Sequence, residues 1–148
     1  MNTTDLDALA ISRLASVGQR YTTCRRRIMH ILTATSDPMT IPLILASAGF
    51  GGLAQSSVYR NLAVLERVGL VQQIPGHHGG HAYFTLGQAA TTSTGDAFLR
   101  CTRCTTITSL TLPAATLKAI AGAAPGQVVT ISIDQVCPTC ATTEAAAS

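Results

Sequence analysis

The sequence predicts an α+β fold in two parts, because its periodicity and its cysteines divide at one small polar segment. Residues 3–68 carry apolar positions at helical spacing, and two short strand patterns follow them. Residues 97–140 carry further strand patterns around two C-x-x-C pairs. Residues 87–95 are small and polar, as in a hinge or linker. We therefore expect domains at 1–86 and 96–140, and a disordered tail over 141–148.

Four helices are expected in the first part, each with a recognisable start or end. Thr4 or Asp5 can cap the first helix, and Thr22 or Thr23 can open the second. Gly69 is a natural terminator for the fourth. Apolar periodicity places the four helices at about residues 4–16, 24–33, 41–48 and 55–68.

The fourth helix has the clearest amphipathic pattern. Tyr59 and Arg60 lie outside its apolar stripe. The stripe consists of Val58, Leu62, Leu65 and Val68. Strands are expected next at 70–74 and 81–86, joined by a turn at 75–80. Helices followed by such a hairpin predict a winged helix-turn-helix.

The second part is expected to be a small α/β unit. Strand patterns at 97–100 and 107–112 lie on either side of the first cysteine pair. Pro113 starts a short helix that reaches about residue 121. A β-branched strand at 127–133 then leads to the second cysteine pair.

Two C-x-x-C pairs, Cys101 with Cys104 and Cys137 with Cys140, are separated by 32 residues. Each pair puts two thiolates on one tight turn, and two such turns complete a closed four-sulfur shell that favours Zn2+. The separation exceeds that of a simple zinc ribbon, so the ion would join elements that are distant in sequence. The alternative is a disulfide pair or a redox-active C-x-x-C.

The composition predicts an aliphatic core and a cytoplasmic protein. Hydrophobic residues make up 47% of the chain and aromatic residues 4%, without any Trp. The longest apolar stretch, 112–124, is interrupted by Pro113, Lys118 and Gly122, so no membrane span is expected. Residues 1–7 are acidic and polar, unlike a secretory signal. In the cytoplasm the thiols stay reduced, which favours zinc over disulfides.

The basic residues are concentrated in the first part of the chain. The formal net charge of +3 is modest, but seven of the ten basic residues precede residue 70. They are Arg13, Arg20, Arg25, Arg26, Arg27, Arg60 and Arg67. Arg25, Arg26 and Arg27 are expected to span the outside of the second helix, where a solvated surface is as good a reading as contact with a partner. A basic first part and a cysteine-bearing second part suggest separate tasks.

Three motifs together resemble the ferric uptake regulator family. The run S-S-V-Y-R-N-L-A-V-L-E-R-V-G-L-V, at residues 56–71, is similar to the recognition-helix signature of that family. Gly18, Arg20 and Thr22, followed by Arg26 or Arg27 before I-M-H-I-L, resemble its N-terminal pattern. The two C-x-x-C pairs around a strand-helix-strand segment resemble its structural zinc site. The resemblance covers about residues 15–140.

The resemblance implies a dimeric DNA-binding transcriptional regulator that acts as a repressor of a palindromic operator. It also implies that 96–140 is a dimerisation domain that holds the structural zinc through its four cysteines. Metal-dependent operator binding is a further implication. No membrane partner is expected.

Five residues of the first part are the expected DNA contacts. By resemblance, Tyr59 and Arg60 contact DNA, and Arg20 approaches the minor groove. A tyrosine ring can pack against thymine methyl groups, and an arginine can donate to guanine or phosphate. An ordinary solvated helix face is the alternative for Tyr59 and Arg60. Ser56 and Ser57 can bond phosphates or merely cap the helix.

The sequence departs from the family at the metal-sensing positions. Members usually carry a second, sensory metal site built from a Glu on the second wing strand, a His before the third helix and an H-x-H motif. By resemblance these ligands fall on Thr85, near Pro38, and on Asp96 and Phe98. The ligands of the other common site fall on Asp96, Ala97, Ser109 and Val129. The usual sensory sites are therefore expected to be dismantled.

Three of the four histidines cluster instead in the wing turn, at His77, His78 and His81. Imidazole is a common ligand of divalent transition metals, so these residues with Asp96 form a candidate second metal site of unknown metal preference. The alternative is a polar wing tip whose histidines touch the DNA backbone or water.

Two other functional classes are alternatives to the regulator. In a thiol- or peroxide-responsive regulator, the four-cysteine site or Cys24 would be the redox switch. An enzyme such as a small thiol oxidoreductase would use Cys101 and Cys104. No nearby candidate acid or base accompanies that pair, and a closed four-cysteine shell has no vacancy for a substrate. We therefore do not expect an enzyme.

Overall fold

The structure, a computed structural model of the 148-residue chain, describes residues 2–49, 52–76, 82–87, 90, 97–104, 106–126 and 130–147. The chain divides into two compact units, Met1–Thr92 and Ser93–Ser148. This division falls inside the segment 87–95 that the sequence predicts to be a linker. Each unit has a sheet of its own.

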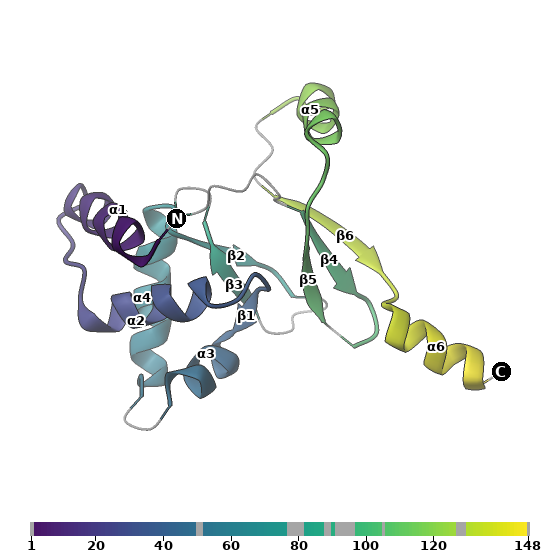
Figure 1. Ribbon diagram of the computed structural model, residues 1–148, viewed down its shortest axis with the longest axis horizontal. Coiled ribbons are helices and arrows are strands. Elements are labelled where there is room, and N and C mark those ends of the chain that lie inside the picture. Colours follow the sequence, from purple (N-terminus) through teal and green to yellow (C-terminus); the bar gives the residue numbers. More distant parts are fainter. Residues whose placement is uncertain are drawn as a thin grey trace. The chain divides into compact units, whose positions relative to one another are not determined.

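The first unit is a helical bundle with a small antiparallel sheet (Figure 1). Within it, three short strands form a sheet of order β1-β3-β2. Its elements are α1 (Thr3–Ala15), α2 (Thr23–Thr33), β1 (Met39–Thr40), α3 (Ile41–Ala48), α4 (Gln55–Arg67), β2 (Val71–Ile74) and β3 (Tyr83–Leu86). Helix α4 followed by the β2–β3 hairpin gives the expected winged helix-turn-helix.

Side-chain capping and apolar periodicity explain these helices. Thr22 caps α2 by accepting from the Arg25 N–H at 3.4 Å, as expected. Asn2, rather than Thr4 or Asp5, caps α1 by accepting from the Asp5 N–H at 2.8 Å, so the expected cap was wrong by two residues or more. The first helix therefore starts at Thr3, one residue earlier than expected.

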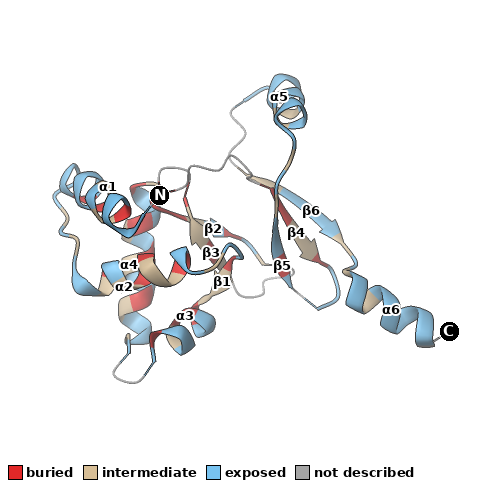
Figure 2. Cartoon of the chain, viewed as in Figure 1, coloured by how far each residue is buried: buried red, intermediate tan, exposed pale blue. Residues whose placement is uncertain are grey.

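The core of the first unit is aliphatic, as the composition predicts. Val58, Leu62, Leu65 and Val68 are all buried, which confirms the expected stripe of α4. This stripe packs in one cluster with residues of the other helices and of the hairpin. They include Leu6, Ala10, Leu14, Ile28, Met29, Leu32, Ile44, Leu70, Val71 and Phe84. The buried stripe leaves the opposite face of α4 exposed to solvent (Figure 2).

The β2–β3 hairpin, which is the wing, is closed at its base by a close approach of two backbone segments, Gly69 and Leu70 before β2 and Gly87 after β3. Gly69 ends α4 with φ of +75°, a conformation that glycine adopts without a steric penalty. The Gly87 N–H donates to the Leu70 carbonyl at 2.9 Å, and a Cβ on Gly87 would overlap the Gly69 carbonyl oxygen. The base of the hairpin is therefore held tightly against the end of the helix.

The second unit contains β4 (Ala97–Cys101), β5 (Ile107–Leu110), α5 (Ala114–Ala123), β6 (Ile131–Gln135) and α6 (Pro138–Ala147). Its sheet has the order β5-β4-β6, in which β4 is antiparallel to β5 and parallel to β6. The chain reaches β6, the parallel neighbour of β4, by way of β5 and α5, which supply the long connection that parallel strands need. Within the described residues of α5, none is buried.

The C-terminal tail differs from its expectation. Residues 141–147 belong to helix α6, where disorder was expected. Pro138 starts the helix, alanine favours it, and the Thr142 and Thr143 hydroxyls donate to the Pro138 and Thr139 carbonyls. None of the helices in the described residues is long and apolar enough to cross a membrane.

Candidate nucleic-acid interface and metal centre

The proposed reading residues lie on the exposed face of α4. Tyr59 is 55% exposed, and Arg60 is exposed with its Nε donating to the Ser56 carbonyl at 3.4 Å. Val58 and Leu62, on the opposite side of the helix, are buried in the core. A helix that is anchored on one face and carries an aromatic and a cation on the other can enter a DNA groove.

The two serines at the start of α4 do not cap it. The N-cap residue is Ala54, which makes no side-chain capping bond. Ser56 is exposed and Ser57 half-buried, both inside the first turn. The capping alternative is therefore wrong, whereas contact of these hydroxyls with phosphate stays a prediction. The N–H groups of this helix start, which lack a side-chain cap, also suit an anion.

Arg20 lies between α1 and α2, where Gly18 has φ of +70°. Its side chain is exposed, as a residue that approaches DNA requires. Its carbonyl oxygen accepts from the Arg25 Nη1 at 2.6 Å. The loop that presents Arg20 is thus fastened to helix α2.

Arg25 is buried, contrary to expectation. The sequence predicts Arg25, Arg26 and Arg27 on the outside of α2, but Arg25 is only 8% exposed. Successive helical residues are about 100° apart, so three in a row cannot share one face. Arg25 precedes Ile28, Met29 and Leu32 by three, four and seven positions, which is the spacing of the buried face. That periodicity was the available signal.

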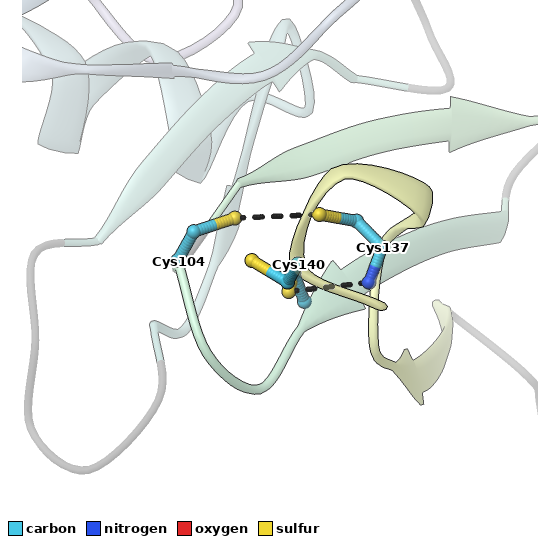
Figure 3. Close-up of side chains that lie close together, drawn as sticks. Cys104, Cys137 and Cys140 are labelled. Carbon is cyan, nitrogen blue, oxygen red and sulfur yellow. Dashed lines mark hydrogen bonds between the residues drawn. The ribbon is translucent and has the colours of Figure 1, made fainter. Parts of the chain in front are cut away.

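The four cysteine sulfurs come together at one end of the second sheet. Cys101 ends β4, Cys104 follows in a turn, and Cys137 precedes Cys140 in the first turn of α6. All four Sγ atoms lie within 4.8 Å of one another. The Cys104 and Cys137 sulfurs are 3.6 Å apart (Figure 3). A tetrahedral Zn2+ with Zn–S bonds of about 2.3 Å needs sulfurs about 3.8 Å apart, so the arrangement fits the ion.

The shifted pKa values of the clustered thiols also favour a bound cation. Backbone N–H groups of Cys104, Cys137 and Arg103 point at the Cys101 sulfur and lower the pKa of that thiol to about 6. Hydrogen bonds with Thr106 lower the pKa of Cys104. Contact with the Cys137 and Cys104 sulfurs raises the pKa of Cys140 to about 12. Some thiols ionise readily while a neighbour resists, because four thiolates need a compensating charge.

The four cysteines that the sequence predicts as zinc ligands therefore lie in one cluster. All five cysteines of the chain are thiols, and Cys24 lies in the other unit. The Cys137 N–H donates to the Cys101 sulfur at 3.3 Å, and the Arg103 N–H donates to the same sulfur at 3.4 Å. Such N–H···S bonds hold the ligands in place before a metal arrives. The disulfide alternative does not match the sulfur separations.

The candidate second metal site is not tested by the structure. His77, His78, His81 and Asp96 all lie outside the described residues. Among the residues that are described, the four cysteines are the only group of three or more His, Cys, Asp or Glu placed to hold a metal. Pro38 and Phe98 are buried and Thr85 is half-buried in β3, and none of the three carries an imidazole or a carboxylate.

Comparison with known proteins gives one family. The model of the ferric uptake regulator family matches residues 16–133 of this chain, which end before Cys137. None of the curated proteins matches the chain.

Solved structures of this family have the same fold. The ferric uptake regulator of Helicobacter pylori, which has three functional metal-binding sites, is 15% identical, with a TM-score of 0.75 over 95% of each chain. That of Pseudomonas aeruginosa, with manganese, is 23% identical, with a TM-score of 0.64 over 86% of this chain and 96% of that one. A zinc uptake regulator in complex with zinc and DNA is 21% identical, with a TM-score of 0.58 over 98% and 99%.

At these sequence identities, structural similarity establishes the fold alone. The family model matches most of the chain and therefore establishes membership of the family. The winged helix-turn-helix and the four-cysteine cluster are both where the resemblance implied them. This protein is therefore a transcriptional regulator that belongs to the ferric uptake regulator family.

Proposed function

We propose that this protein is a homodimeric, cytoplasmic repressor that reads a palindromic operator through α4, with zinc as a structural ion. The exposed pair Tyr59 and Arg60, on a helix anchored by its opposite face, is the observation that carries the proposal. Each recognition helix would enter a major groove, and Arg20 would approach the adjacent minor groove. Two helices on successive major-groove faces would exclude polymerase from the operator.

The role proposed for zinc is to hold the second unit together. When bound, the ion would join the end of β4 to the start of α6 through four thiolates. A closed four-sulfur shell has no position for substrate, so this site supports assembly and not catalysis. The Arg103 guanidinium also bonds the Glu144 carboxylate at 2.9 Å, which ties the first cysteine turn to α6.

The proposal is tested by substituting the exposed face of α4. Operator duplexes are selected from a random pool with the zinc-loaded full chain, and affinity is measured by fluorescence anisotropy. We expect Tyr59→Ala and Arg60→Ala each to weaken operator binding about 10- to 100-fold, because one good base contact contributes about 1–3 kcal/mol. If Arg60 reads a base, its loss also relaxes the sequence preference, whereas loss of a phosphate contact weakens all duplexes equally.

Arg67→Ala is the matched control, since Arg67 is an exposed cation in the last turn of the same helix. We expect it to weaken operator binding less than threefold, as for one screened surface charge. All three variants should keep the thermal midpoint of the unmodified protein within about 2 °C, because their side chains are exposed. Operator binding by Tyr59→Ala and Arg60→Ala as tight as that of the unmodified protein would disprove the proposed reading helix.

The regulatory signal is proposed to be a metal ion bound at the wing. The same titration with and without added divalent ions tests this, using His77→Ala, His78→Ala and His81→Ala together as the variant. If these histidines with Asp96 hold a sensory metal, the metal-dependent gain in affinity disappears in the triple variant. The thiol-responsive alternative predicts instead that peroxide abolishes operator binding through the zinc cysteines or Cys24.

A further inference from the structure

We propose that Arg25 is a positioning residue for DNA recognition, which fixes α4 relative to the loop that carries Arg20. Arg25 does not belong to the exposed face, because it is 8% exposed. The inference rests on the proposed function, since it concerns how two DNA-reading elements keep their relative placement.

The guanidinium of Arg25 donates in three directions to three segments of the first unit. Its Nε donates to the Asn61 Oδ1 on α4 at 2.9 Å. Its Nη1 donates to the Arg20 carbonyl at 2.6 Å, and its Nη2 donates to the Gln19 Oε1 at 2.9 Å. One side chain thereby joins α2, the recognition helix and the loop of Arg20.

Only a guanidinium can make this set of contacts. Its donors spread in a rigid planar fork, whereas the ammonium of lysine is a compact donor at the end of a flexible stem. Each of the three acceptors is a neutral oxygen, so the buried charge is stabilised by hydrogen bonds rather than by a carboxylate partner. Burial of a cation without hydrogen bonds has a high free-energy cost. The bonds of Arg25 therefore restrain the positions of their acceptors.

Asn61 passes this constraint to the reading face of α4. Besides accepting from Arg25, its Nδ2 donates to the Ser57 carbonyl at 2.7 Å and lies 3.2 Å from the Cys24 sulfur. Asn61 directly follows Arg60 and lies two residues after Tyr59 in the middle of α4. A shift of Asn61 against Arg25 would therefore displace both proposed reading residues relative to Arg20.

The neighbouring arginines have different partners, which supplies a control. Arg26 donates to the Asp7 Oδ2 of α1 at 2.9 Å, and Arg27 donates to the Ala48 carbonyl at the end of α3 at 2.6 Å. Neither bonds α4 or the loop of Arg20 in the described contacts. Arg26→Lys can keep its ion pair with Asp7, whereas Arg25→Lys keeps the charge and loses the three-way fork.

The experiment measures discrimination, defined as affinity for the selected operator divided by affinity for a random duplex of equal length. Zinc-loaded full chain is used, and a uniform change in charge cancels in the ratio. We expect Arg25→Lys to reduce discrimination about 10- to 100-fold, as loss of hydrogen bonds to a charged group implies. Arg26→Lys should retain discrimination within about threefold.

A pair of substitutions at Asn61 separates positioning from stability. Asn61→Leu removes the acceptor for Arg25, and Asn61→Asp keeps it while losing the same Nδ2 donor. We expect Asn61→Asp to retain discrimination and Asn61→Leu to lose it about tenfold. The Arg25 Nε–H signal in the NMR spectrum should stay protected from exchange in Asn61→Asp and lose protection in Asn61→Leu.

Asp7→Asn controls for destabilisation, because it weakens the bonds of Asp7 to Tyr21 and Arg26 and leaves the three bonds of Arg25 in place. It should lower stability and preserve discrimination. Full discrimination in folded Arg25→Lys or in Asn61→Leu would overturn the positioning role. A loss of discrimination in Asp7→Asn as large as that in Arg25→Lys would also overturn it. If the unmodified protein prefers no duplex, the proposed function itself fails, which is a different result from unchanged ratios in the variants.

Discussion

At the scale of the residue, the three consecutive arginines of α2 show that position on a helix outweighs residue type. Arg25 is buried and joins α4 to the loop of Arg20. Arg26 pairs with Asp7 of α1, and Arg27 bonds the last carbonyl of α3. The rotation of about 100° per residue sends adjacent side chains to different neighbours. Helix α2 is thus the hub to which the other three helices of the first unit are fastened.

Asp7 is the centre of a second polar cluster in the first unit. Its Oδ1 accepts from the Tyr21 hydroxyl at 2.8 Å and lies 3.0 Å from the His30 Nε2, while its Oδ2 accepts from Arg26. Burial alone would raise the pKa of Asp7, but the bonds from Tyr21 and His30 and the charge of Arg26 outweigh it and lower the pKa below 3.8. Burial and Asp7 raise the pKa of Tyr21. The ionised carboxylate therefore stabilises the fold.

Asp7→Asn should lower the free energy of unfolding of the first unit by about 1 kcal/mol at pH 7. The estimate is small because Arg26 is largely exposed and solvent screens its pair. Because the folded pKa lies below the unfolded one, the carboxylate contributes above the unfolded pKa, and its contribution is lost as the pH falls through the folded value. The two proteins should differ from pH 7 to about 5 and converge below about pH 4.

Urea unfolding followed by tyrosine fluorescence measures this difference specifically. All three tyrosines, Tyr21, Tyr59 and Tyr83, lie in the first unit, and the chain has no Trp. Loss of zinc at low pH affects both proteins equally and cancels in the comparison. A constant difference between the two proteins from pH 7 to pH 3.5 would contradict the proposed role of the ionised carboxylate.

At the scale of the element, a helix or strand is predictable from the sequence when the residues that determine it lie within its own segment. Helix α4 was predicted within one residue, because its buried stripe, its exposed pair and its terminal Gly69 all lie within its own sequence. Strand β1, of two residues, was missed because it exists only through pairing of Met39 and Thr40 with β3. Arg25 was expected on the outside of its helix, and its neutral acceptors belong to separate segments, so neither its burial nor its partners were predicted.

The zinc cluster was predictable because a C-x-x-C turn fixes ligand geometry locally. What the sequence left open was which structural elements the ion joins. The structure places one pair at the end of β4 and the other at the start of α6, next to the parallel β4–β6 pairing. Cys101 is fully buried, so its thiolate lies inside the second unit rather than on a mobile surface turn.

Removal of zinc should therefore loosen one part of the chain and leave the other intact. In hydrogen exchange with a chelator, we expect protection around residues 101–104 and 137–140 to fall about tenfold or more, since binding and folding are coupled at such sites. Protection of buried α4 residues such as Leu62 and Leu65 should change less than threefold, because they lie in the other unit. Readdition of Zn2+ is the control for reversibility. An equal loss of protection in both regions would show that the two units are not independent.

At the scale of the whole molecule, the second unit has a small core: among its described residues, only Ala97, Phe98, Cys101 and Ile107 are buried. Ile133 is 40% exposed and Val136 38% exposed, and α5 has no buried residue among those described. Strand β6 lies at an edge of the sheet, where another chain can add contacts. These features suit the subunit interface of a homodimer, whereas the first unit has a well-covered core of its own.

Ile133→Lys should therefore weaken the dimer. Ile133 lies on β6 beside Leu99 of β4, and burial of an isoleucine side chain contributes about 1.5–3 kcal/mol. We expect the dimer dissociation constant, measured by sedimentation velocity, to rise at least about tenfold. Ser132→Lys is the matched control, because adjacent strand residues face opposite sides of the sheet and Ser132 is also exposed.

The same substitution should reduce operator affinity without changing the reading residues. A monomer engages one half-site, whereas a dimer gains from the high effective concentration of its second winged helix. Ile133→Lys should therefore bind an isolated half-site as well as the unmodified protein does, and should lose the advantage of the full palindrome. Dimers as stable as those of the unmodified protein would place the interface elsewhere. Monomers that still prefer the full palindrome would show instead that recognition does not depend on the paired arrangement of two α4 helices.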